Sequence, residues 1–266
     1  MSNPVLSEAT FDKLTFEAAN DDELKINTSA DLGDDGEDFA TPIDEAKLMP
    51  KVMTASGTVN KTIFLLLLTF CSSIVSYLYP FEGTACVLSL VGLLLAVIMS
   101  FKPQLSPYFS SLYSICEGFL LGTISYWANA FKGGIAAQAA FCTMVVLFVM
   151  LAIYRLRIIK VNQTFMMVLS AGLSSLMLFY LFVFIMQLLG FSLGPIYHGP
   201  AGIFINVAIC LMASFCLLAD FENINVGIQR QAPKFMEWYC AFSLLVSLVW
   251  IYLEILRFLM SRSNRD

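Results

Sequence analysis

Three acidic residues, Glu117, Asp220 and Glu254, stand inside long apolar stretches of the sequence. An ionised acid is costly at membrane depth, so an acid in such a position marks a functional site by default. A cluster of these acids can bind a cation, relay protons or act as a pH-sensitive latch, because two carboxylates that share a site cannot both ionise cheaply. Oxygen ligands favour Ca²⁺ or Mg²⁺ over softer metals. We therefore predict an ion or pH gate formed by Asp220, Glu254 and Glu117, with Asp220 and Glu254 as metal ligands.

Arg257 offers a competing explanation for Glu254. It follows Glu254 by three positions, and residues at that spacing can pair on the surface of a helix. The same arginine is also a candidate for a cation that latches the acids. Two further acids, Glu222 and Glu237, stand at the ends of their apolar runs and are expected to reach water or headgroups.

Enzymatic chemistry finds little support. The single histidine, His198, lies in a predicted loop, and no GxSxG, HExxH or Walker A pattern is present. The seven cysteines all fall inside apolar runs without CxxC spacing, which argues against a disulfide framework or a zinc site. We expect no enzyme activity and no cofactor, apart from Ca²⁺ as a permeant or bound ion.

Composition indicates a polytopic membrane protein. Of the 266 residues, 58% are hydrophobic and 13% are charged, whereas about a quarter of the residues of a soluble domain are charged. A membrane span needs about 20 apolar residues, and no alternating pattern of a membrane β-barrel is present. The fold class is therefore all-α, with a predicted bundle of seven transmembrane helices near residues 62–79, 83–101, 107–130, 134–154, 163–189, 201–222 and 238–259.

The first 50 residues form a separate, acidic region. They hold thirteen acids against three lysines, whereas residues 51–266 hold seven acids against twelve bases. Such a polar and aperiodic segment is typical of a disordered tail. It has no signal-peptide pattern, and its DLGDDGED stretch fails as an EF-hand because Pro42 takes the place of the last ligand. Neither region has a basic patch with interleaved aromatic residues, so no nucleic-acid partner is expected.

The basic residues of the loops predict the orientation. With a cytoplasmic N-terminus, only Lys132 among the loop bases falls outside, but seven crossings also place Arg262 and Arg265 outside. Either the last segment is a genuine seventh span at some cost to this charge rule, or one late segment is re-entrant. The length of the segment favours the span. The cytoplasmic bases would be Lys47, Lys51, Lys61, Lys102, Arg155, Arg157, Lys160, Arg230 and Lys234.

Small residues predict where helices approach closely. Gly118 and Gly122 form a GxxxG pair, and Ser125 continues the same face. Such pairs let two membrane helices pack with their backbones near each other, so we expect a helix contact here.

Several ordered segments resemble the Bax inhibitor-1-like (YccA-type) membrane proteins, also called the transmembrane Bax inhibitor motif family. The resemblance covers about residues 48–260, and the SNPVL and MTASGTVNKT stretches are similar to the bacterial branch. The segments that carry it are EGFLLGTIS, LADFENI, APKFMEW and AFSLLVSLVWIYLEILRFL.

This resemblance implies a seven-helix bundle with the last helix near its centre, and a pH-sensitive calcium leak gated by an acidic pair. Asp220 matches the acid of the sixth helix, and Glu254 matches the acid of the seventh, which is commonly Asp. The second-helix Arg that can accompany the pair has no counterpart here, so the latch either lacks its cation or recruits another, such as Arg257. A bacterial plasma membrane is the expected location. The alternative function is a non-conducting regulator that binds another membrane protein, such as a quality-control protease.

Helix geometry bears on whether the two acids meet. An antiparallel hairpin centred near Pro233 places Asp220 level with about Ser247. Glu254 lies seven residues further along, which is roughly 10 Å at 1.5 Å per residue. A direct pair therefore requires an asymmetric turn, a tilt or a helix break.

Overall fold

A computed structural model describes residues 52–80, 82–190 and 200–263; the acidic region 1–50 lies outside this part of the chain. Seven long α-helices account for nearly all of the described residues, which contain no β-strand apart from one isolated bridge between Val52 and Pro233. This confirms the all-α class. The helices are α3 (Ala55–Leu78), α4 (Glu82–Phe101), α5 (Ser106–Phe131), α6 (Ile135–Arg155), α7 (Gln163–Leu188), α9 (Pro200–Gln229) and α10 (Met236–Ser263), with a short 3-10 helix η1 (Pro103–Leu105) before α5.

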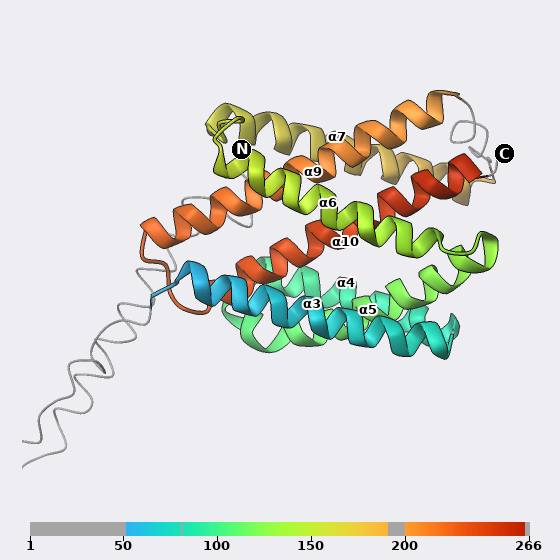
Figure 1. The fold of residues 1–266 in the computed structure, drawn as a ribbon, viewed down its shortest axis with the longest axis horizontal. Coiled ribbons are helices and arrows are strands. Elements are labelled where there is room, and N and C mark those ends of the chain that lie inside the picture. The colour runs from blue at the N-terminus through green and yellow to red at the C-terminus, as the bar shows by residue number, and fades with distance from the viewer. Residues whose placement is uncertain (1–51, 81, 191–199, 264–266) are drawn as a thin grey trace, which may run out of the picture.

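Each predicted span coincides with one of these helices. Six of them are long and apolar enough to cross a membrane, and the exception is α5, whose sequence is richer in serine and tyrosine. In the bundle, α5 nevertheless lies alongside α3 and α4 and also contacts α6 and α10. The last segment is one continuous helix of 28 residues, and its C-terminal end lies at the end of the bundle opposite the start of α3 (Figure 1). A seventh long helix, not a re-entrant segment, is therefore present.

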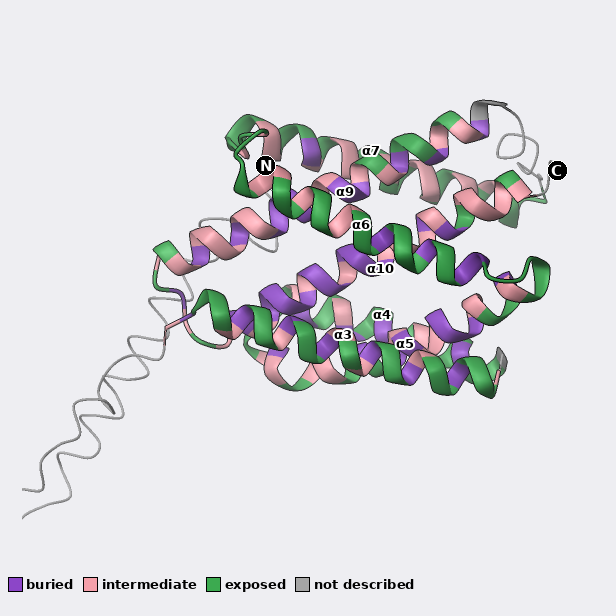
Figure 2. Cartoon of the chain, in the orientation of Figure 1, coloured by how far each residue is buried: buried purple, intermediate pink, exposed green. Residues whose placement is uncertain are grey.

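The last helix, α10, is the centre of the bundle. It contacts α3, α5, α6 and α9. In an apolar stretch of 18 residues within α10, 67% of the residues are buried, compared with 6% in the corresponding stretch of α7. Figure 2 shows the same contrast between a largely buried α10 and a largely exposed α7. A helix that is apolar on all sides needs protein or lipid around it, so α10 is covered by protein and α7 is left for lipid.

Local signals set the helix ends. The hydroxyl of Thr54 caps α3 by accepting a hydrogen bond from the Gly57 amide at 3.1 Å, and Asn162 caps α7 through the Phe165 amide. Helix α9 runs to Gln229, seven residues past its predicted apolar limit, because the polar ENINVGIQ segment continues the helix.

The GxxxG pair of α5 lies against α3, as expected. A methyl group added at Gly118 would overlap Ser72 and the Thr69 carbonyl oxygen, and one added at Gly122 would overlap the Ser73 carbonyl oxygen. The two helix backbones thus approach closely at glycine, as in small-residue packing of membrane helices.

Candidate functional site

Asp220 lies at the interface between α9 and α10. Its side chain is buried, with 6% of its surface exposed. Ser243 donates a hydrogen bond to Oδ1 at 2.6 Å, and Ser247 donates one to Oδ2 at 2.5 Å. Among the described residues no basic side chain pairs with this carboxyl group, so two hydroxyls from α10 are its polar partners.

The partner at Ser247 agrees with the simple hairpin geometry. The chain leaves α9 with a positive φ of 52° at Gln231 and enters α10 at Met236. This turn is short and keeps the two helices in the register expected from a centre near Pro233. Asp220 therefore meets Ser243 and Ser247, one helical turn apart, and it does not reach Glu254.

Glu254 lies further along α10 and faces α7. It is 2% exposed and accepts hydrogen bonds from Tyr180 at 3.2 Å and Trp250 at 3.3 Å through Oε1. Its Oε2 is 3.4 Å from Arg257 Nη1, which also donates to the Tyr180 hydroxyl at 3.1 Å. The competing i+3 pair with Arg257 is thus present, and Tyr180 connects it to a second helix.

Glu117 lies at a third interface. It is partly buried on α5 and is hydrogen-bonded to Tyr113 one turn earlier. A methyl group added at Gly92 of α4 would lie 3.7 Å from its Oε2, so the carboxylate faces α4.

The three predicted gate acids are therefore distributed over separate helix pairs, α9–α10, α7–α10 and α4–α5. The structure does not bring Asp220 and Glu254 together, because seven residues of straight helix separate Glu254 from the Ser247 level. Within the described part of the chain, no group of three or more His, Cys, Asp or Glu side chains is placed to hold a metal ion.

Glu237 forms a buried cluster that the sequence analysis missed. It was expected to reach water from the end of its apolar run, but only 1% of it is exposed. Its carboxylate pairs with Lys61 of α3 and accepts hydrogen bonds at 2.9 Å from both the amide and the hydroxyl of Thr54. Glu237 thus attaches the start of α3 to the start of α10. Glu222, the other acid of this kind, is partly buried and accepts a hydrogen bond from Tyr154 at 2.9 Å.

A family model described as Bax inhibitor 1 like matches residues 3–264. The chain belongs to the Bax inhibitor 1-like family. The match extends beyond residues 48–260, where the sequence motifs carried the resemblance, and it includes the acidic N-terminal region. A comparison with the curated proteins finds no match. Family membership and six apolar helices of spanning length agree on an integral membrane protein.

Proposed function

We propose that this Bax inhibitor 1-like protein is a pH-sensitive calcium leak of a bacterial plasma membrane, with its N-terminus in the cytoplasm. The observation that supports this most is the buried Asp220 at the α9–α10 interface, held by two hydroxyls and by no basic side chain of the described residues. A hydroxyl can donate to a carboxylate or accept from a neutral carboxyl group. The interface can therefore accommodate either protonation state of Asp220 by rearranging its hydrogen bonds.

In this proposal the protonated form keeps α9 and α10 closed. Loss of the proton leaves a charge in an apolar interface, which favours the entry of water or a divalent cation. Glu254 has a secondary part, because Arg257 already compensates its charge. The sequence predicted that Asp220 and Glu254 bind a metal ion as a direct pair. In the present proposal Asp220 acts with Ser243 and Ser247 of α10 instead.

Calcium flux into dye-loaded liposomes at several pH values tests the proposal. The wild-type flux should rise with pH, and Asp220→Asn should make it independent of pH. Glu222→Gln, which changes an acid two residues away on the same helix, is the matched control and should keep the pH dependence. An unchanged pH profile in Asp220→Asn would refute the gate at Asp220.

Absence of flux from the wild-type protein at every pH would favour the alternative, a non-conducting regulator of another membrane protein. In that case the acidic region is the first part to test. Deletion of residues 1–46 should then change which membrane proteins copurify with the chain.

A further inference from the structure

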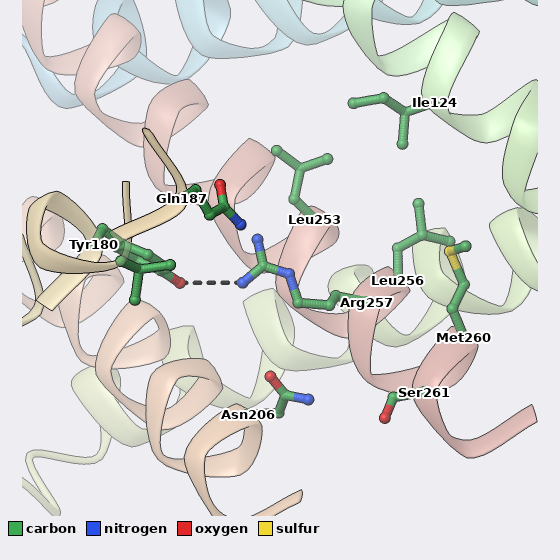
Figure 3. Close-up of a pocket in the computed structure, with 10 residues that line it drawn as sticks. Ile124, Tyr180, Gln187, Asn206, Leu253, Leu256, Arg257, Met260 and Ser261 are labelled. Carbon is green, nitrogen blue, oxygen red and sulfur yellow. Dashed lines mark hydrogen bonds between the residues drawn. The ribbon is translucent and has the colours of Figure 1, made fainter. Parts of the chain in front are cut away.

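A cavity opens near the C-terminal end of α10, at the interface of α5, α7, α9 and α10. Its volume is about 630 Å³, which is within the usual range of small-molecule sites. One wall is apolar and includes Ile124, Leu253, Leu256 and Met260. Figure 3 shows these side chains on one side of Arg257, with Tyr180 and Gln187 of α7 on the other.

Asn206 of α9 contributes a buried and unsatisfied polar group to this cavity. Only 2% of the residue is exposed, and its Oδ1 has no hydrogen-bond partner among the residues that the structure describes. Leaving a buried acceptor unpaired costs about 1–3 kcal/mol, and native proteins rarely tolerate it without a reason. The atom is an acceptor, so the group that would satisfy it is a hydrogen-bond donor.

Arg257 contributes the opposite chemistry to the same cavity. Its side chain is about half exposed, at 48%, and its Nη1 contacts the Tyr180 hydroxyl and Glu254. Glu254 itself is buried beneath this contact and is not part of the cavity wall. The charged group that a ligand meets is therefore a guanidinium, which favours phosphate and carboxylate groups.

Polar residues of the cavity lie near the ends of helices of spanning length, where a bilayer has its headgroup region. Gln187 lies in the last turn of α7, Asn206 in the second turn of α9, and Arg257 within the last two turns of α10. A guanidinium at this level can form charge-assisted hydrogen bonds with the phosphate of a lipid headgroup. The apolar wall, which a free phosphate ion cannot use, favours a ligand with acyl chains.

We propose that this cavity binds a phospholipid whose headgroup carries both a phosphate and a hydrogen-bond donor. Arg257 contacts the phosphate, Asn206 Oδ1 accepts the hydrogen bond of the headgroup donor, and the glycerol and first methylenes lie along the apolar wall. The site is separate from Asp220, so its occupancy is measured without reference to flux.

Native mass spectrometry of the full-length protein in detergent tests this. The probes are phosphatidylethanolamine, which has a phosphate and an ammonium donor, phosphatidylcholine, which has the same net charge but no donor, and the soluble glycerol 3-phosphate. The wild type should retain phosphatidylethanolamine about tenfold better than phosphatidylcholine, the ratio that corresponds to one good hydrogen bond. Asn206→Leu should abolish this preference, and Arg257→Gln should weaken the binding of both lipids.

The controls keep the result interpretable. Arg262→Gln removes a positive charge from the same end of α10 at an exposed residue outside the cavity and should bind like the wild type. Asn206→Leu replaces an amide whose Oδ1 is unpaired with an apolar side chain of similar size. This variant should therefore unfold at the same temperature as the wild type or higher. Equal retention of the two lipids by the wild type, or an unchanged preference in Asn206→Leu, would overturn the proposal. Glycerol 3-phosphate binding as tightly as the lipid would also overturn it, in favour of a soluble anion.

Discussion

Asp220 and Glu254 are both buried acids, but their partners give them different chemistry. Glu254 has a guanidinium partner, because Oε2 lies 3.4 Å from Arg257 Nη1. Asp220 has serine hydroxyls, which can bond either to a carboxylate or to a carboxylic acid. The pH sensitivity that we propose is therefore assigned to Asp220 and not to Glu254.

Removal of both hydroxyls tests this view of Asp220. The double variant Ser243→Ala, Ser247→Ala leaves a buried carboxyl group without donors, and each hydrogen bond to a charged group is worth about 2 kcal/mol. We expect a lower unfolding temperature in detergent, with a larger decrease at high pH, where the carboxyl group must ionise. Ser175→Ala, which removes only a hydroxyl bonded within exposed α7, should have little effect.

The same serine double variant made in an Asp220→Asn background provides the check. A neutral amide needs the donors less, so the additional loss of stability should be small and independent of pH. If the loss is as large as with Asp220 present, the serines act through packing and not through the charge.

Sequence reasoning located the acids but not all of their partners. The level of Ser247 followed from one short turn and a constant rise per residue, so it could be predicted. Tyr180 could not, because hydropathy does not show which helix lies beside α10 at Glu254. Glu237 was misplaced for a related reason: its partner Lys61 is 176 positions away, and the end of an apolar run looks solvated until the neighbouring helix is known.

The contact between helices α3 and α5 depends on two glycines of α5, Gly118 and Gly122. The Thr69 carbonyl oxygen lies in the helix backbone and cannot move away from a methyl group at Gly118 without shifting α3. Overpacking of this kind costs about 1–3 kcal/mol. Gly118→Ala should therefore lower the unfolding temperature, whereas Gly83→Ala, at a helical position of α4 with open space around it, should leave it unchanged or raise it. Equal behaviour of the two variants would contradict the close approach.

The ion pair between Lys61 of α3 and Glu237 of α10 should stabilise the contact between the starts of these two helices. Removing one partner of a buried ion pair costs about 3–5 kcal/mol when the other charge stays buried. Lys61→Met leaves Glu237 without its cation and should destabilise the protein strongly, even though the lysine is partly exposed.

A double-mutant cycle separates this charge effect from lost packing. Glu237→Gln in the Lys61→Met background removes the uncompensated charge and should restore part of the stability. Additive losses from the two substitutions would mean that the pair contributes no coupling, and the two Thr54 hydrogen bonds would then account for the attachment of α3.

The helices themselves were the most predictable part of the fold. An apolar run of spanning length allows only a helix in lipid, which accounts for six of the seven predicted runs. The remaining run is the less apolar α5, which is also a helix. The end of α9 was not predictable from hydropathy, since a helix can continue with polar residues past the apolar boundary. The central position of α10 could not be predicted from its own composition, because α10 has a lower mean hydropathy than α7. It is buried because the neighbouring helices surround it.

The seven long helices of residues 52–263 that the structure describes alternate in direction, and this fixes which loops share a side of the membrane. The basic residues Lys102, Arg157 and Lys234 lie at the end of the bundle where α3 begins, and Lys132 lies at the other end together with the end of α10. Because basic loops stay in the cytoplasm, the start of α3 should face the cytoplasm and Ser261 should face outwards. Single cysteines placed in a variant without its seven native cysteines test this in intact cells with an impermeant maleimide.

Lys132→Cys and Ser261→Cys should react from outside, whereas Lys102→Cys and Arg157→Cys should react only after permeabilisation. The Ser261 result has the most weight, since Arg262 at that end opposes the charge rule and the helix count must override it. If Ser261→Cys reacts only after permeabilisation, as Lys102→Cys is expected to do, α10 does not complete its crossing. A reversed pattern at all four positions would keep the seven helices and invert the protein, and it would place the cavity at Asn206 in the cytoplasmic leaflet.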